Sequence, residues 1–398
     1  MGKTVVVLGA GQGGLAAAER LRAIVPPADR VELIDRSFTG SLGLSALRVL
    51  RGWNTAEQVT TTVTAAALPG VSMTTAEVVG IDPEAKTVRY HSRDVDTEIG
   101  YDALVVALGA TLNTAAVPGL DEAMSRGLAG QFYTPDGAAE LHRRIDTLES
   151  GRVLVLIAAM PFKCPPAPYE AAFMIAELLG ERFTAGHVKV DVFTCEPRPI
   201  GVASCEVGDS LVGMIEARRI GFHPGKSTAA VDADARMVHF ADGSAEAFDV
   251  LAVVPPHASP VAATLAGGVN PAGWIPVDSA TMATSLPGVW AVGDNTALML
   301  ANDKPIPKAG FAAEAGARTA ADQIARYLGY SAPDSRLVAE GGCIVEVGGG
   351  LAAMIAGEFT AVPAPLVQMH EPSASLHAEK ERQEREWLTR WSVLPAQT

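Results

Sequence analysis

The sequence is poor in cysteine, in charge and in long apolar runs. Its 398 residues include four cysteines, and none is spaced as in the CxxC pairs of metal sites. Charged residues make up 19% of the chain, and no run of 18 apolar residues predicts a membrane-spanning helix. The formal net charge of −14 argues against nucleic acid as a partner and against a broad basic surface for docking on membranes.

The start of the chain shows no apolar signal segment ahead of the first predicted strand, at residues 3–8. We therefore expect a cytoplasmic protein, at most peripheral to a membrane. In a reducing compartment a bond between two cysteines is more often a redox couple than a structural crosslink. The length allows two or three domains with a sizeable core.

A glycine-rich turn is the strongest signal in the first part of the chain. The motif GAGQGG occupies residues 9–14, directly after the strand at residues 3–8. A helix over residues 15–24 and a second strand that ends on Asp35 complete a strand–turn–helix–strand unit. The combination is typical of dinucleotide binding, whereas the glycine motif alone is weak.

Three glycines of this motif and the acid that follows it each have a physical role. Gly9 permits the tight turn, Gly11 lets a pyrophosphate approach the backbone, and Gly14 lets the helix pack on the strand. Asp35 is placed to bond a ribose hydroxyl. The sequence thus predicts a nucleotide site at this turn.

A second strand–turn–helix unit begins at Gly151 but lacks that chemistry. A strand is expected over residues 153–157 and a helix over residues 170–179. The turn between them, residues 158–166, has no glycine, three prolines that supply no N–H group, and Cys164. The turn therefore has the position of a nucleotide site without its phosphate-binding backbone.

The fold class that follows is α/β, with two Rossmann-like units, the second inserted in the first, and a C-terminal segment. We expect residues 1–118 and 255–328 to form the first domain and residues 119–254 the second. Residues 329–398 would then close the site between them. Further elements expected from their patterns are strands at residues 101–110, 188–193, 248–254 and 287–295, an Ala-rich helix at 310–327, and a charged helix at 378–394.

Three stretches together resemble the flavoproteins that have two dinucleotide-binding domains. They are GAGQGG with Asp35, YDALVVALGA before Pro118-Gly119, and GVWAVGDN at residues 288–295. The resemblance implies that FAD is the cofactor of the first unit. The residues that it places around FAD are Gly9, Gly11, Gly14, Asp35, Val79, Gly109, Asp294, Lys308 and Gly310.

The stretch CPPAPYE, from Cys164 to Glu170, narrows the resemblance. It is similar to sulfide:quinone oxidoreductases and to the flavoprotein subunit of flavocytochrome c sulfide dehydrogenase. The resemblance implies a disulfide beside the flavin between Cys164 and Cys343, with Glu170 as acid or base. It further implies FAD-dependent oxidation of sulfide or a related reduced sulfur species, with a quinone or a cytochrome as the electron acceptor.

Some features depart from this family. The third cysteine that many members carry before the second domain has no match, and neither do their histidines near the sulfide and quinone sites. The alternatives are an NAD(P)H-dependent FAD reductase and a non-catalytic electron-transfer flavoprotein subunit. A homodimer and peripheral contact with a membrane are the remaining partner hypotheses, and no metal is expected.

The residues of the candidate site also have structural interpretations. Cys164 precedes a helix, whose dipole together with Lys163 is expected to favour the thiolate, and we prefer a redox role over an inert buried cysteine. From its own surroundings Cys343 is as well explained as a structural cysteine, and Glu170 as a helix-capping acid. Cys195 and Cys205 are interpreted as structural or incidental, and His223 and His257 as loop residues.

Overall fold

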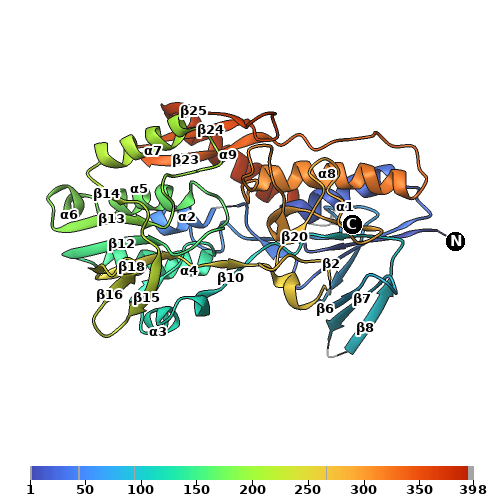
Figure 1. The fold of residues 1–398 in the computed structure, drawn as a ribbon, viewed down its shortest axis with the longest axis horizontal. Coiled ribbons are helices and arrows are strands. Elements are labelled where there is room, and N and C mark those ends of the chain that lie inside the picture. The colour runs from blue at the N-terminus through green and yellow to red at the C-terminus, as the bar shows by residue number, and fades with distance from the viewer. Residues whose placement is uncertain (1, 44, 94, 266, 393–398) are drawn as a thin grey trace, which may run out of the picture.

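The computed structural model describes residues 2–43, 45–93, 95–265 and 267–392. Two parallel five-stranded sheets lie side by side, and a three-stranded antiparallel sheet near the end of the chain lies over the second of them (Figure 1). The arrangement is the mixed α/β architecture with two Rossmann-like units that the sequence predicts. Among the described residues no helix is long and apolar enough to cross a membrane.

The first sheet has β1 at its centre, because this strand is apolar after Thr4 and is buried on both faces from Val5 to Leu8. The strand order is β21-β9-β1-β2-β5, with every neighbouring pair parallel. A strand from much later in the chain thus completes the sheet built by the first hundred residues. The strands are β1 (Thr4–Leu8), β2 (Arg30–Asp35), β5 (Ser72–Thr75), β9 (Ala103–Val106) and β21 (Val289–Ala291).

Two helices of this unit, α1 (Gln12–Ile24) and α8 (Gly310–Tyr327), pack against each other. Small residues make the close approach possible: a side-chain carbon added at Gly13 would lie 3.5 Å from the Cβ of Ala313. The Ala-rich composition of residues 310–327 thus serves helix packing. The first unit also carries a separate antiparallel sheet, which consists of β6 (Glu77–Asp82), β7 (Thr87–Ser92) and β8 (Val95–Gly100).

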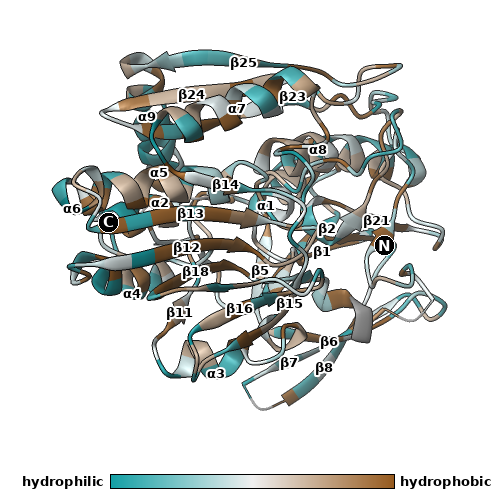
Figure 2. Ribbon diagram, turned by 60° about the vertical axis from the view of Figure 1, so that its left-hand side comes forward, coloured by the Kyte–Doolittle hydropathy of each residue, from teal (hydrophilic) through white to brown (hydrophobic). Residues whose placement is uncertain are grey.

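The second sheet has the order β11-β18-β12-β13-β14 and is again parallel. Its central strands are strongly apolar, as Figure 2 shows by their brown colour. Its strands are β11 (Ala129–Gly130), β12 (Gly151–Ile157), β13 (Val188–Thr194), β14 (Gly221–His223) and β18 (Val250–Val254). The helices of this unit are α3 (Leu120–Ser125), α4 (Pro135–Asp146), α5 (Ala167–Leu179), α6 (Glu181–Thr184) and α7 (Cys205–Ala217).

The C-terminal part consists of β23 (Glu340–Gly348), β24 (Leu351–Glu358), β25 (Leu366–Ser373) and α9 (Ala374–Trp391). The antiparallel strands pack on α5 and α7, and α9 packs back on the strands. The helix begins four residues earlier than expected because the Ser373 side chain caps it by accepting from the N–H of Leu376. The expected end at Leu394 lies outside the described residues.

The remaining described elements are short. They are α2 (Ser45–Arg51), β3 (Thr39–Gly40), β4 (Thr61–Thr62), β10 (Thr111–Leu112), β15 (Thr228–Asp232), β16 (Met237–Phe240), β17 (Ala245–Ala247), β19 (His257–Ala258), β20 (Ile275–Pro276) and β22 (Thr296–Ala297), with 3-10 turns at Thr114–Ala116, Pro260–Ala263 and Gly293–Asn295. The residue boundaries proposed for the domains remain a prediction.

The contact between Gly14 and the turn before α1 provides a test of the fold. A Cβ at Gly14 would lie 1.7 Å from the carbonyl oxygen of Gly9, so helix and turn would have to separate. We expect Gly14→Ala to lower the free energy of unfolding by about 1–3 kcal/mol, measured by urea denaturation.

The matched control is Gly213→Ala, because this glycine lies within α7 with no atom within 4 Å of an added Cβ. It should raise the stability by about 0.5–1 kcal/mol through helix propensity. A gain of stability in both variants would contradict the tight contact between Gly14 and the carbonyl oxygen of Gly9.

Candidate active site

A single large cavity joins the features that the sequence singled out. Its volume is about 800 Å³, and its walls come from the first unit, the second unit and α9. Gly11 and Asp294 line it from the first unit, Cys164 from the second, Cys343 from β23 and Trp387 from α9. Segments far apart in the sequence therefore meet at one site.

The glycine turn has the shape that a pyrophosphate needs. Gly9 has a φ of 95°, which favours glycine, and a Cβ at Gly11 or Gly109 would meet no atom within 4 Å. Asp35 orders the loops beside the turn, because its carboxylate accepts from the N–H groups of Ala10, Ser37 and Phe38 at 2.8–2.9 Å. Its remaining lone pairs can accept ribose hydroxyls.

Asp294 and Lys308 form the opposite wall. The Lys308 ammonium group donates to the carbonyl oxygens of Asp294 and Thr296 at 2.6 and 3.1 Å and lies 3.7 Å from the Trp274 ring centroid. Burial lowers the pKa of Lys308 to about 8 and raises the pKa of Asp294, with each charge partly offsetting the other. The Asp294 carboxylate lines the cavity and is placed to accept hydroxyl groups of a cofactor.

Of two further residues expected at the cofactor, Gly310 and Val79, only the first borders the cavity. Gly310 lines the cavity, and a Cβ there would lie 2.0 Å from Oε1 of Gln12, so the glycine gives that side chain room. Val79 lies on β6, where 44% of its surface is exposed, and it does not line the cavity. Its contact with adenine through the backbone stays a prediction. Taken together, the walls fit FAD: an open glycine turn, an acid for a ribose and a carboxylate for polyol hydroxyls.

The first cysteine is held by a bridge between the two units. The N–H of Cys164 donates to the carbonyl oxygen of Lys308 at 2.7 Å, so the turn at residues 158–166 is tied to the loop that bears this lysine. Cys164 adopts a φ of 49°, in the left-handed region. Its carbonyl oxygen accepts from the N–H of Ala167 at the start of α5.

The second cysteine is carried by β23, where it pairs with Ile355 of β24. The two glycines before it permit close approach, as expected, but to protein atoms: a Cβ at Gly341 would lie 2.8 Å from the Phe311 ring. A Cβ at Gly342 would lie 2.3 Å from the carbonyl oxygen of Ile355. The glycines thus press β23 against α8 and β24 and bring Cys343 to the cavity wall.

Cys164 and Cys343 lie within hydrogen-bonding distance, both as free thiols. The Cys164 thiol donates to the Cys343 sulfur, and this bond together with burial raises the pKa of Cys164 well above its ordinary value. The same bond, helped by the Lys380 ammonium group, lowers the pKa of Cys343. This bond favours Cys343 over Cys164 as the thiolate of the reduced pair, in the opposite sense to the effect expected of the helix end and Lys163.

Glu170 lies in the first turn of α5 with 2% of its surface exposed. Burial raises the pKa of its carboxyl, while the ammonium group of Lys380, which contacts the carboxylate directly, opposes that shift. Sequence reasoning missed Lys380. The two residues are separated by 210 positions, and only the fold brings them together.

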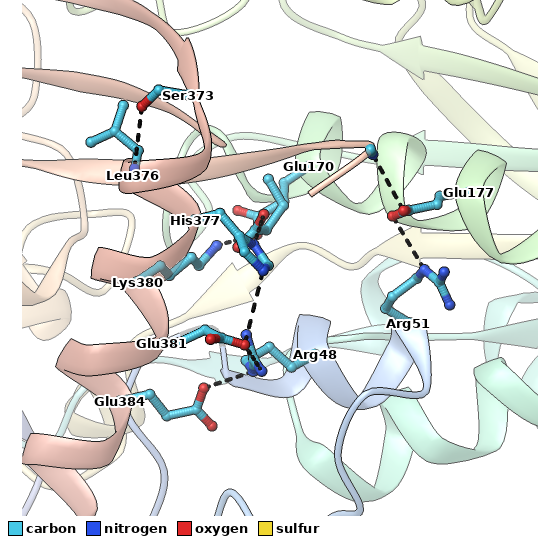
Figure 3. A network of polar contacts seen from close by, with 12 residues as sticks. Arg48, Arg51, Glu170, Glu177, Ser373, Leu376, His377, Lys380, Glu381 and Glu384 are labelled. Atoms are coloured by element: carbon cyan, nitrogen blue, oxygen red, sulfur yellow. Dashed lines mark hydrogen bonds and ion pairs between the residues drawn. The ribbon is translucent and has the colours of Figure 1, made fainter. Parts of the chain in front are cut away.

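Three further polar contacts attach α9 to its neighbours, and Figure 3 shows the two that Arg48 makes. Arg48 of α2 contacts Glu381 at 2.9 Å and Glu384 at 3.0 Å. His377 contacts the buried Glu346 of β23 at 2.9 Å. One face of α9 therefore bonds to groups around the cavity, so this helix packs on the protein.

The second unit fills its own nucleotide position with protein groups. Glu196, near where a ribose-binding acid would lie, is buried and accepts from the Tyr169 hydroxyl at 2.6 Å and from Thr194 at 3.3 Å. Burial raises the pKa of Glu196. The N–H groups of Cys164 and Ala167 are bonded to carbonyl oxygens, so they are not available to phosphate.

The expectation that His223 and His257 are loop residues is wrong. His223 ends β14 and stacks on Phe193 with ring centroids 4.1 Å apart, and His257 begins β19. His257 packs edge-on against Tyr133, which lines the cavity. Cys195 is partly buried and Cys205 exposed at the start of α7, and both are free thiols outside the cavity lining.

Comparison with known proteins agrees with this architecture. Residues 3–154 match the family model described as pyridine nucleotide-disulphide oxidoreductase. Residues 138–255 match the model described as sulfide dehydrogenase (flavocytochrome c) flavoprotein chain, central. Residues 3–154 thus resemble the pyridine nucleotide-disulphide oxidoreductases, and residues 138–255 resemble the central part of the sulfide dehydrogenase flavoprotein chain. The predicted resemblance is thereby confirmed, and so is FAD as the cofactor, because these are FAD-binding families whose cofactor residues fit the cavity described above.

Two relatives carry sulfide in their names. The sulfide-quinone reductase of Aquifex aeolicus is 30% identical over 200 residues, 50% of this chain and 44% of the relative. The mitochondrial sulfide:quinone oxidoreductase of Mus musculus is 25% identical over 305 residues, 74% of this chain and 66% of the relative. The chain therefore spans less than two thirds of either relative.

A solved structure shows the same fold over nearly the whole chain. The sulfide:quinone oxidoreductase of the hyperthermophilic bacterium Aquifex aeolicus superposes with a TM-score of 0.83. The superposition covers 98% of this chain and 91% of the chain in that structure, at 22% sequence identity. The doubly nested α/β fold predicted from the sequence is confirmed.

The buried His257 beside the cavity gives a pH-dependent prediction. Burial lowers its pKa from 6.5 to about 4, so between these values the unfolded chain binds a proton that the folded chain does not. The free energy of unfolding should therefore fall by about 3 kcal/mol as the pH drops from 6.5 to 4. Denaturation of His257→Asn across this range should lack that component.

The control for loss of a histidine is His187→Asn, because His187 is exposed. It should keep the pH dependence of the unmodified protein. Equal slopes for His257→Asn and the unmodified protein would contradict the burial of a neutral imidazole.

Proposed function

We propose that the chain catalyses FAD-dependent oxidation of sulfide or a related reduced sulfur species through Cys164 and Cys343. The observation that carries the proposal is the hydrogen-bonded cysteine pair in the wall of the cavity that also holds the glycine turn and Asp294. A dithiol is the two-electron reduced form of a disulfide. FAD, when bound, supplies a two-electron acceptor in the same cavity.

The acid–base properties of the pair indicate which sulfur is attacked. In the oxidised form a hydrosulfide anion attacks the Cys164 sulfur, and a bond forms between the two sulfur atoms. The bond between Cys164 and Cys343 breaks, and Cys343 leaves as a thiolate, leaving a persulfide on Cys164. The better leaving group is the thiol of lower pKa, which is Cys343.

Glu170 is the nearby group able to take a proton from hydrogen sulfide. Its raised pKa brings the carboxyl closer to neutral pH, where a general base works best. Its burial at the cavity wall, next to Lys380, keeps it within reach of the cysteine pair. The helix-capping interpretation does not require any of these contacts.

The alternative of NAD(P)H as electron donor finds no support in the second unit. Its turn offers prolines and N–H groups that are already bonded to carbonyl oxygens. The Glu196 carboxylate already accepts a hydrogen bond from the Tyr169 hydroxyl. A pyrophosphate requires the opposite arrangement. Electrons therefore enter from sulfur.

The electron acceptor is proposed to be a quinone or a cytochrome, on the analogy of the named relatives. A quinone would be reached from the surface of a membrane, by peripheral contact. Turnover with a short-chain ubiquinone and with cytochrome c, at equal sulfide, distinguishes the two. Homodimer formation remains a proposal that a sedimentation measurement tests.

Anaerobic titration of the purified oxidised protein with sulfide tests the donor. We expect the flavin absorbance bands to bleach with sulfide and to persist with NADH, because the second unit cannot hold the nucleotide. Cys164→Ser should bind FAD normally but abolish bleaching by sulfide, since no disulfide can form.

Cys205→Ser is the matched control, because Cys205 is exposed and lies outside the cavity lining. It should bleach as the unmodified protein does. Bleaching by NADH but not by sulfide would overturn the proposal in favour of an NADH-dependent reductase. Undiminished bleaching of Cys164→Ser by sulfide would rule out the disulfide route.

A further inference from the structure

Lys380 brings a positive charge to the cysteine pair from the C-terminal helix. Its side chain is 17% exposed, lines the cavity and contacts the Glu170 carboxylate. The ammonium charge favours the anionic form of both Cys164 and Cys343, and the Glu170 charge disfavours it. Both thiols are therefore subject to two opposite charges, which contact each other.

The other charged groups near this lysine are themselves paired. On α9, Glu384 is bonded to Arg48 of α2, and His377 is bonded to Glu346 of β23. The backbone N–H of Glu346 also donates to the Glu170 carboxylate. Lys380 and Glu170 thus form the charged pair of this network that borders the sulfur atoms.

The position of Lys380 is fixed by the packing of α9. Glu384 lies one turn further along the same face of the helix and Glu381 is the next residue in the chain, and both contact Arg48, as Figure 3 shows. His377 precedes it by one turn and anchors the helix to β23. These contacts on either side hold the lysine at the cavity wall.

We propose that Lys380 is a positioning residue that sets the protonation state of the cysteine pair, holding Cys343 as the thiolate while Glu170 opposes it. The inference rests on the proposed function for its purpose, since a stable Cys343 thiolate is the leaving group of the sulfur reaction. It also identifies the C-terminal helix as part of the reactive site.

Opposite charges must produce opposite effects, and this distinguishes an electrostatic role from a structural one. Removing Lys380 should make the Cys343 thiolate less stable, and removing the charge of Glu170 should make it more stable. Loosening of α9 would act in the same direction in both variants. The sign of each shift is therefore the decisive readout.

The experiment measures the alkylation rate of Cys343 by iodoacetamide as a function of pH, in the reduced holoprotein, by peptide mass spectrometry. Lys380→Met should raise the midpoint by about one to three pH units, the effect of a neighbouring opposite charge. Lys380→Arg should stay near the unmodified value, and Glu170→Gln should shift the midpoint downward. The double variant Lys380→Met/Glu170→Gln should lie between the two single variants.

Arg382→Met is the control for loss of a cation from α9, because its side chain is exposed and bonds Glu379 and Glu386. Its midpoint should not move. An unchanged midpoint in Lys380→Met, or shifts of the same sign in Lys380→Met and Glu170→Gln, would overturn the inference. Alkylation needs no sulfide, so this result is independent of whether sulfide reduces the flavin.

Discussion

A buried carboxylate beside two thiols is the constraint on which the site depends. Taking Glu170 out of water is costly unless a cation comes with it, and a buried ion pair stabilises only when both partners are present. The cation is supplied by a helix from the other end of the chain. The helix that closes the cavity therefore also supplies the countercharge of its buried carboxylate.

The two Rossmann-like units use the same backbone plan for different chemistry. In the first unit, the turn before α1 leaves space for a ligand at Gly11, where an added Cβ would meet no atom within 4 Å. In the second, the equivalent turn directs its N–H groups inward and presents a sulfur atom instead. The hydrogen bond from Cys164 to Lys308 joins the second turn to a loop of the first unit, so the reactive sulfur is held by the unit that binds the cofactor.

Much of the fold could be predicted from the sequence because its signals are local. The glycine turn, the buried strands and the helix at residues 310–327 follow from periodicity and turn residues, and the structure places them within a few positions. Cys164 and Glu170 could also be found, since both lie at one strand–turn–helix unit.

The protonation of the pair could not be predicted from the sequence. It depends on Cys343 and Lys380, which reach the site only through the packing of β23 and α9. A helix dipole acting on Cys164 is a local effect, whereas the hydrogen bond that raises the pKa of Cys164 comes from a cysteine brought in by the fold.

The left-handed backbone of Cys164 has an evolutionary consequence. At a φ of 49° a glycine would be at ease, whereas valine, isoleucine or threonine would be strained. The position that carries the reactive sulfur is thus one where a nucleotide-binding turn would carry glycine. Exchange of Cys164 for glycine would keep this backbone path and remove the thiol, so sulfur reactivity can be lost here without rebuilding the fold.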